Sequence, residues 1–354
     1  MESEFWNCCV NNLSKDDVCP ICGEKFYDDP NEKFWDNPNE KINAQNMNII
    51  EQSTNSIAQD LTFSNIKLID QSVKFIDSQD FNGVDGKIEY CGRVCYNSAH
   101  KMKIESFPGE YERSFLTQRA IEGHTSIFEH GRVKVDKTAF DFALWERFVN
   151  SENMSNEQYH FVLSRISIKD LKYYSVNVRD ILNVGYITED WTKLPEVEDY
   201  FTVEIVCNRA IANELVRHRV CSFSQASTRY IKYKDTLEFI RPFDEKYLDD
   251  FKRAFDQSAK IYRILIENSV APQNARDVLG LGFATKLIMT ATLDHWIGVA
   301  NLRLPTAAHP QIRELMKMIF NLPQVKDKFQ NWVSQRGMND WRSRYDYIQR
   351  LLKK

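Results

Sequence analysis

The sequence predicts a mixed α+β protein, because segments with strand-like and helix-like spacing both run along the chain. Strands show strict alternation of apolar and polar residues, whereas helices show apolar residues three and four positions apart. The 354 residues are 43% hydrophobic and include 22 Phe, 15 Tyr and 7 Trp, which is ample for a sizeable core. The net charge of −4 is mild, so we expect no nucleic-acid partner for the main domain and only local anion sites.

Residues 1–60 differ in composition from the rest of the chain and are expected to form a separate cysteine-rich extension. Cys19 and Cys22 enclose a Cys-Pro-Ile-Cys-Gly turn, which is typical of a zinc knuckle. A structural zinc needs further ligands, and no histidine precedes His100, so a plain cysteine-rich arm is the alternative. The polar composition of residues 28–54 predicts a linker.

Three features of the sequence predict the cellular compartment of the protein. No apolar run approaches the roughly 20 residues that a bilayer span requires. The first residues carry acids rather than a basic, apolar leader. The eight cysteines are scattered, which suits a reducing compartment better than a disulfide framework. We therefore expect a soluble, intracellular, cytoplasmic protein without a membrane partner.

The elements follow from the spacing of apolar residues along the chain. Alternation predicts strands over 66–70, 73–76 and 200–206. Residues 61–340 should form the main domain, with a helical insertion near 136–198 and a C-terminal tail at 341–354. Helices are predicted, in order, over 87–96, 116–123, 140–150, 157–166, from 176 onward, 208–218, 248–268, 284–303, and lastly from about 310 to about 320.

Residues 217–230 hold the most concentrated set of side chains that could bind a ligand or take part in a reaction. They hold three guanidinium groups, one imidazole, three serine hydroxyls and a carboxamide, with no apolar period in the second half. The charges share one sign and alternate with hydroxyls, a combination that suits phosphate oxygens. A solvated surface loop is the alternative interpretation of the same residues. No Gly-rich phosphate loop occurs, which argues against a Rossmann or P-loop nucleotide site.

The order of residues within this stretch resembles a known family. Arg217, His218 and Arg219, then seven residues, then Ser227, is similar to the signature of the flavin-dependent thymidylate synthases. The segments 123–130, 272–279 and 301–313 also resemble that family in order, so that the likeness covers about residues 65–335. The resemblance implies an antiparallel sheet flanked by helices, and a homotetramer with shared active sites.

The resemblance also implies an activity. Members of the family use FAD and NADPH to convert dUMP to dTMP, with the carbon taken from methylene-tetrahydrofolate. It assigns the catalytic role to Arg303, which would stabilise negative charge on the pyrimidine. It assigns substrate binding to Glu214, Arg217, Gln225, Ser227, Thr228, Arg229 and Arg276, and FAD binding to Ser126, Arg217, His218, Arg219, Gln225 and His309.

Several of these residues have plainer interpretations. Arg276 and Arg303, taken singly, suit helix-end or salt-bridge roles. Cys221 lies inside the motif, and we expect it to pack rather than to act as a nucleophile. Ser227 has no neighbouring His–acid pair to activate it, so it is expected to bind substrate. His130 is expected to be structural.

The chain departs from the family pattern where the family contacts FAD. An Asn-Leu-Arg type triplet is replaced by Thr292, Leu293 and Asp294, and a further polar contact falls at Gly298. Residues 279–282 read Leu-Gly-Leu-Gly, where a Pro-Asn-Ser type turn is common. An anion in place of a cation should weaken the binding of a dinucleotide. The alternatives are therefore a pyrimidine-nucleotide hydroxymethylase, or a non-catalytic nucleotide-binding or assembly protein on the same scaffold.

Overall fold

The computed structural model describes residues 66–102, 111–150, 154–168, 172–184, 194–233, 236–336 and 339–353. The chain divides into two units, Met1–Asn65 and Ile66–Lys354. The first unit lies outside the described residues, and with it the predicted zinc ligands Cys19 and Cys22 and the predicted linker. Those assignments stay predictions. No helix in the described ranges is long and apolar enough to cross a membrane.

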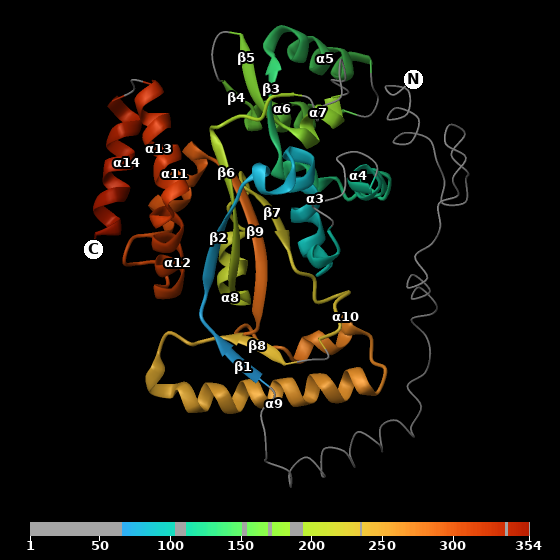
Figure 1. Ribbon diagram of the computed structural model, residues 1–354, viewed down its shortest axis with the longest axis vertical. Coiled ribbons are helices and arrows are strands. Elements are labelled where there is room, and N and C mark those ends of the chain that lie inside the picture. The colour runs from blue at the N-terminus through green and yellow to red at the C-terminus, as the bar shows by residue number, and fades with distance from the viewer. Residues whose placement is uncertain are drawn as a thin grey trace, which may run out of the picture. The chain divides into compact units, whose positions relative to one another are not determined.

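A four-stranded antiparallel sheet, in the order β2-β6-β9-β7, forms the centre of the second unit (Figure 1). Alternation sorts the side chains of β6 onto two faces, with Val203 and Ile205 on one and Thr202 and Glu204 on the other. The longest pairing joins all nine residues of β6 to β9. The strands are β2 (Ser72–Ile76), β6 (Tyr200–Asn208), β7 (Ser222–Gln225) and β9 (Ala284–Thr292).

One face of this sheet packs against helices to form the main hydrophobic core. The Phe201 ring stacks on the Trp296 indole with centroids 4.6 Å apart and an interplanar angle of 5°. The same core holds Leu315 and Phe329 from later helices. In Figure 1 these helices lie together on the left of the sheet. They are α11 (Leu293–Arg303), α12 (Pro310–Asn321), α13 (Pro323–Arg336) and α14 (Asn339–Leu352), with α8 (Arg209–Leu215) contributing from the other end.

The opposite face of the sheet is more polar and is covered by α3 (Val84–Cys95). Cys91 and Val94 of α3 pack on Ile288 of β9. Buried hydroxyls occupy neighbouring positions on this face, including those of Thr202 and Thr290. A buried polar face needs internal hydrogen bonds, and this one has them.

The predicted insertion near residues 136–198 supplies two strands of a second, three-stranded antiparallel sheet, whose third strand, β3, lies just before it. Its strand β5 pairs with β3, which follows the 3₁₀ helix Thr125–His130. Figure 1 shows this part at the top of the unit, above the central sheet. Its elements are β3 (Arg132–Asp136), α5 (Lys137–Asn150), α6 (Asn156–Arg165), β4 (Ser167–Ile168), β5 (Tyr173–Asn177) and α7 (Val178–Val184), and α4 (Tyr111–Ile121) precedes them.

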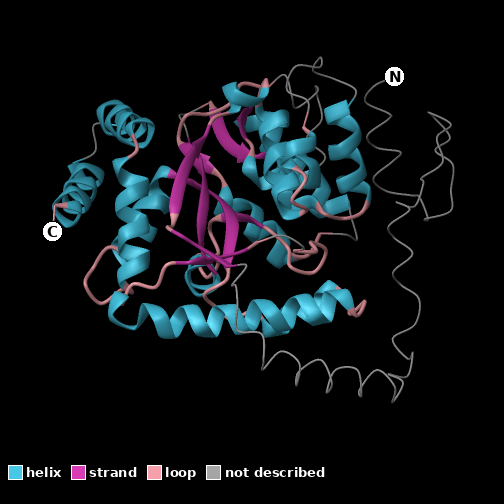
Figure 2. Cartoon of the chain, turned by 60° about the horizontal axis from the view of Figure 1, so that its bottom comes forward, coloured by secondary structure: helices cyan, strands magenta, loops and turns pink. Residues whose placement is uncertain are grey.

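A third layer closes the other end of the central sheet. The parallel pair β1 (Ile66–Ile69) and β8 (Leu237–Ile240) packs on α9 (Leu248–Glu267), which runs across the front of Figure 2. The short helix α10 (Pro272–Ala275) follows α9 and begins on a proline, as expected at a helix start. This end of the sheet therefore brings residues 272–276 near the start of β9.

Three element predictions were wrong. Residues 284–303 were predicted as one buried helix, but Ala284–Thr292 is the strand β9 and the helix begins at Leu293. β9 lies between two strands and is buried on both faces from Leu287 to Thr292, so its sequence shows no strict alternation of apolar and polar residues. The helix predicted from residue 176 begins at Val178, after β5. The helix to residue 320 is not the last, because α13 and α14 follow it.

The prediction for residues 222–225 also needs correction. The lack of an apolar period in the second half of residues 217–230 gave no sign of a strand, but residues 222–225 form β7, an edge strand that pairs with β9 from Ser222↔Thr290 to Gln225↔Leu287. An edge strand has one exposed flank, so it does not need a regular apolar period. The strand predictions at 66–70, 73–76 and 200–206 are confirmed, as is the long helix over 248–268. The mixed α+β class with antiparallel sheets is confirmed.

Candidate functional site

The ends of two helices converge where the predicted motif begins. α8 ends at Leu215, a turn follows, and β7 begins at Ser222. α8 begins where the Asn208 side chain accepts a hydrogen bond from the Ile211 backbone N–H at 2.8 Å, so its start is capped. α11 ends at Arg303. The carboxyl ends of both helices therefore carry the residues that the resemblance assigns to catalysis and binding.

Arg303 is held by three hydrogen bonds to the end of α8. Its Nη1 donates to Glu214 Oε2 at 2.7 Å, and its Nη2 donates to the Glu214 carbonyl at 3.1 Å. Its Nε donates to His218 Nε2 at 3.0 Å. The side chains of Arg303 and Glu214 are about one fifth and one third exposed, so the ion pair is open to a ligand on one side. Three predicted residues thus form a single cluster.

The histidine in this cluster is neutral at ordinary pH. Burial lowers the pKa of His218, and the positive charge of Arg303 lowers it further. Because Nε2 accepts from Arg303, the ring proton is assigned to Nδ1. His218 therefore orients the guanidinium without adding a second positive charge.

A second group of predicted residues lies around the loop after β7. Gln225 Nε2 donates to Thr285 Oγ1 at 3.3 Å, and the Arg229 backbone N–H donates to Ser227 Oγ at 3.1 Å. The Arg229 Nε donates to the Gln273 side chain at 3.2 Å, which ties the loop to α10. Thr228 in this loop is buried, and Arg276 directly follows α10 with an exposed side chain.

Arg209, which was not predicted as a site residue, lies behind this loop. Its Nη2 donates to the Ala226 carbonyl at 3.3 Å. Burial lowers the pKa of Arg209, and the nearby charge of Arg276 adds to the lowering. Three guanidinium groups therefore gather around one short loop, although the chain as a whole is acidic. A basic residue in the first turn of a predicted helix, where anions are favoured, was the available signal.

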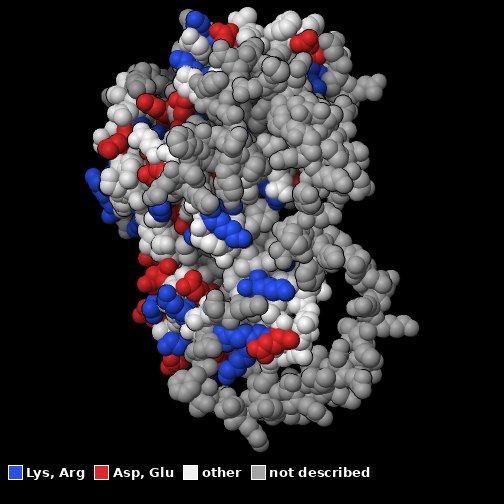
Figure 3. Space-filling view, turned by 45° about the vertical axis from the view of Figure 1, so that its right-hand side comes forward, with Lys and Arg blue, Asp and Glu red and all other residues white. Residues whose placement is uncertain are grey.

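Figure 3 shows how local the positive charge is on one face of the molecule. Lys and Arg side chains are numerous in its lower half, where Asp and Glu side chains lie beside several of them, mostly towards the left edge. Arg217 and Arg219 are both exposed, and neither forms an ion pair with a described residue. Cations without carboxylate partners are available to an anionic ligand.

Two predicted flavin contacts stand apart from both groups. Ser126 is exposed on the 3₁₀ helix Thr125–His130. His309 is exposed and caps α12, where its Nδ1 accepts from the Gln311 backbone N–H at 3.2 Å. Neither side chain hydrogen-bonds to another predicted site residue within the described ranges. Their assignment to a flavin stays a prediction.

The predictions for Cys221 and His130 can be compared with their surroundings. Cys221 is buried in the main core, and burial raises the pKa of its thiol to about 12, so it is not poised as a nucleophile. His130 is fully buried, with Nδ1 2.7 Å from Thr290 Oγ1 and Nε2 2.9 Å from Ser224 Oγ. Both ring nitrogens have hydroxyl partners, which suits a structural residue.

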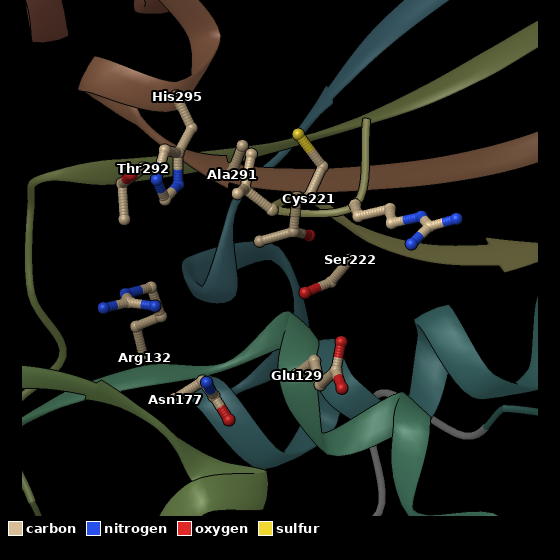
Figure 4. A pocket seen from close by; sticks show the side chains of 11 residues that line it. Glu129, Arg132, Asn177, Cys221, Ser222, Ala291, Thr292 and His295 are labelled. Atoms are coloured by element: carbon tan, nitrogen blue, oxygen red, sulfur yellow. The ribbon is translucent and has the colours of Figure 1, made fainter. Parts of the chain in front are cut away.

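A pocket lies at the other end of β9, where α11 begins (Figure 4). It is lined by charged and polar side chains from four different parts of the chain, together with the apolar turn before β7. Arg219, Cys221 and Thr292 were already singled out in the sequence, whereas Arg132, Asn177 and His295 were not. The lining residues include Arg132, Asn177, Arg219, Thr292 and His295. No cluster of three or more His, Cys, Asp or Glu suited to a metal occurs in the part of the chain that the structure describes.

Comparison with known families identifies the central part of the chain. Residues 187–328 match the family model Thy1, described as thymidylate synthase complementing protein. The match covers less than half of the chain and shows that this segment is similar to the Thy1 family. The predicted resemblance to the flavin-dependent thymidylate synthases is thereby confirmed. The Thy1 segment contains β6 through α12, with both clusters of predicted residues, whereas β3 and β5 lie outside it.

Curated proteins named flavin-dependent thymidylate synthase resemble the same region. One from Geobacter sulfurreducens is 34% identical over 113 residues, or 30% of this chain and 49% of the relative. One from Pyrococcus furiosus is 31% identical over 129 residues, 34% of this chain and 53% of the relative. One from Sulfurisphaera tokodaii is 27% identical over 162 residues, which are 44% of this chain and 60% of the relative. The chain thus spans about half to three fifths of these relatives.

Proposed function

We propose that the protein is a flavin-dependent thymidylate synthase, a methyltransferase that moves a one-carbon unit from methylene-tetrahydrofolate to carbon 5 of dUMP. The cluster of Arg303, Glu214 and His218 is the observation that carries this proposal. The names of the relatives and the Thy1 match support it. FAD is the proposed cofactor and NADPH the proposed reductant, in a homotetramer with shared sites.

The reaction needs a stable cation beside the pyrimidine. Carbon 5 of uracil is a weak nucleophile, and negative charge builds on the ring as it is activated. The guanidinium group of Arg303 presents a planar set of hydrogen-bond donors. Glu214 and His218 fix its orientation before substrate arrives, so little reorganisation is required during the reaction.

The phosphate of dUMP is proposed to bind at the loop after β7. Arg229 and Arg276 provide guanidinium groups, and Ser227 provides a hydroxyl, all suited to phosphate oxygens. Arg209 adds a partly buried cation behind the loop. Thr228 and Gln225 are proposed to complete the binding of the nucleotide.

The residues of this chain fit a flavin dinucleotide in part. Arg217 and Arg219 are exposed cations without carboxylate partners in the described ranges, and Thr292 has a buried hydroxyl without a hydrogen-bond partner. Asp294 places an anion at the start of α11, which opposes a nearby phosphate. When bound, the flavin supplies hydride chemistry, so that the chain needs no cysteine nucleophile. Arg217, His218, Arg219 and Gln225, with Ser126 and His309, are the proposed contacts.

The spectrum of the purified protein tests this proposal most directly. A flavin absorbance band at near one equivalent is expected, and the product from labelled dUMP should carry the mass of a methyl group. A hydroxymethyl product would favour the related hydroxymethylase instead. A colourless chain that cannot be reconstituted with FAD would favour a nucleotide-binding or assembly protein. Zinc analysis of the full chain tests Cys19 and Cys22 separately.

A further inference from the structure

Arg209 is a partly buried cation that has no anionic partner among the described residues. Its side chain makes one hydrogen bond there, from Nη2 to the neutral carbonyl of Ala226 at 3.3 Å. Burial lowers the pKa of Arg209, and the positive charge of Arg276 lowers it further. Arg276 forms no ion pair with a described residue either. Two cations therefore lie near each other with no carboxylate of the described ranges between them.

The titratable groups around Arg209 do not compensate its charge. Cys207 of β6 and Tyr233 both interact with it electrostatically. Burial raises the pKa of each to about 12, so the thiol and the phenol are neutral near pH 7. The Tyr233 ring packs on Phe283 with centroids 5.1 Å apart, and its backbone N–H donates to the Tyr262 hydroxyl at 3.3 Å. A partly buried cation without a countercharge is costly and calls for a physical reason.

The loop in front of Arg209 is fixed through its backbone. The Ala226 N–H donates to the Lys286 carbonyl of β9 at 2.8 Å, and the Ser227 N–H donates to the Cys95 carbonyl of α3 at 3.0 Å. Because Arg209 donates to the Ala226 carbonyl, its guanidinium is held at the peptide that joins Ala226 to Ser227. A charge that is already in place attracts an anion without the cost of ordering a side chain on binding.

A structural role alone does not explain why this residue carries a charge. The Ala226 carbonyl needs a donor, which a neutral Gln also supplies. The guanidinium adds a charge that Arg276 repels. A phosphate at the loop offsets that repulsion, because the Coulomb energy between a cation and a ligand grows in proportion to the charge of the ligand.

We propose that Arg209 makes the loop after β7 selective for a dianionic phosphate, as a positioning residue behind Ala226 that does not contact the base. The inference rests on the proposed function, because its ligand is the pyrimidine nucleotide that the loop is proposed to bind. It deepens that function by dividing the roles. Ser227, Arg229 and Arg276 bind the phosphate. Arg209 determines how strongly a free terminal phosphate is preferred to a phosphodiester or to a nucleoside.

Calorimetric titration of the full chain with dUMP, its phosphate monomethyl ester and deoxyuridine measures this preference. The three ligands carry about two, one and no negative charges at pH 7, so the wild-type chain should bind them in that order of affinity. Arg209→Gln keeps a donor for the Ala226 carbonyl and removes the charge. It should weaken the binding of dUMP about tenfold and of the ester about threefold, and leave that of deoxyuridine unchanged. Arg209→Lys keeps the charge and should retain most of the preference.

Arg241→Gln is the matched control. Arg241 is also partly exposed, but its charge is compensated, because its Nε donates to Asp70 Oδ1 at 3.0 Å. This variant should bind all three ligands as the wild-type chain does. Melting curves show that the variants are folded, and Arg209→Gln should melt close to the wild-type temperature, since it loses part of a hydrogen bond and also loses the repulsion from Arg276.

Three results would overturn the role of Arg209. The first is a wild-type chain that binds dUMP and its ester equally well. The second is an Arg209→Gln variant that keeps the wild-type ratio of the two affinities for dUMP and deoxyuridine, whether both are unchanged or both are weakened equally. The third is an Arg209→Lys variant that binds dUMP as weakly as Arg209→Gln.

These results are distinguishable from a failure of the proposed function. A wild-type chain that binds none of the three ligands refutes the synthase proposal together with this inference. A wild-type chain that binds dUMP but gives one of the three results above refutes only the role of Arg209. The expected loss of preference in a chain that forms no dTMP would support the role of Arg209 and refute the synthase proposal.

Discussion

Arg303 and His218 lie 85 positions apart in the chain, yet the Nε of one donates to the Nε2 of the other at 3.0 Å. The contact joins the end of α11 to the turn after α8. It requires a neutral imidazole, and both burial and the adjacent guanidinium lower the pKa of His218. The motif and the proposed catalytic arginine are thus one physical unit.

Arg303→Ala should abolish dTMP formation while leaving flavin absorbance in place. The change removes the cation beside the pyrimidine and also leaves Glu214 without its 2.7 Å partner. Because the ion pair is partly exposed, we expect a loss of stability of only about 1 kcal/mol. Turnover and urea unfolding measure the two effects. Arg253→Ala, at an exposed pair with Asp250, is the control and should change neither.

His130 should make the protein less stable in mild acid. Burial lowers the pKa of His130 to about 4, whereas the unfolded chain titrates near 6.5. As the pH falls below about 6.5, the imidazole is protonated in the unfolded state but not in the folded state. The free energy of unfolding therefore falls until the pH reaches about 4. The full effect is about 3 kcal/mol. Urea unfolding between pH 7 and 5 measures the slope.

Two variants separate this titration from other effects. His130→Gln should flatten the dependence of stability on pH over that window. Ser224→Ala removes only the 2.9 Å hydroxyl partner of Nε2 and keeps the imidazole. It should lower stability at pH 7 and keep the slope, and an unchanged slope in His130→Gln would exclude His130 as its cause.

Lys87→Met should destabilise the protein by about 3 kcal/mol. Lys87 is 3% exposed, and its Nζ donates to Glu196 Oε1 at 2.7 Å and to the Tyr200 hydroxyl at 2.5 Å. Burial raises the pKa of Glu196, but Lys87 and the hydroxyls of Ser78 and Tyr200 outweigh it, so that the pKa is lowered. Removing the cation leaves this carboxylate partly buried without a countercharge.

The double variant with Glu196→Gln tests this explanation. It removes the uncompensated charge and should recover part of the stability lost in Lys87→Met. Chemical unfolding of the two single variants and the double variant gives the coupling free energy. Strictly additive losses would show that the Lys87–Glu196 contact contributes nothing.

Gly298→Ala should stabilise the protein by about 0.5–1 kcal/mol. Gly298 lies inside α11, and a methyl group there would meet no atom within 4 Å. Gly131→Ala is the contrasting variant, because its methyl group would lie 2.6 Å from Val84 Cγ1 and 2.7 Å from Ile88 Cδ1. That change should cost about 1–3 kcal/mol. Urea unfolding of both variants is the measurement, and equal shifts would contradict the packing.

The sequence by itself determined the mixed fold class, the strands β1, β2 and β6, the long helix α9, and the resemblance of residues 187–328 to the Thy1 family. These features depend on local spacing and on a motif whose residues are close in the chain. The same local spacing failed for β9, since a strand buried on both faces carries no alternation.

Only the tertiary structure decided which of the predicted residues meet. It joined Arg303 to Glu214 and His218, brought Arg209 behind the loop at Arg229, and left Ser126 and His309 apart from these clusters in the described ranges. It also brought Arg132 of β3 to the pocket beside Thr292. The contacts of Arg303 join residues 85 and 89 positions apart, and no local pattern specifies them because they depend on how strands pair and helices pack.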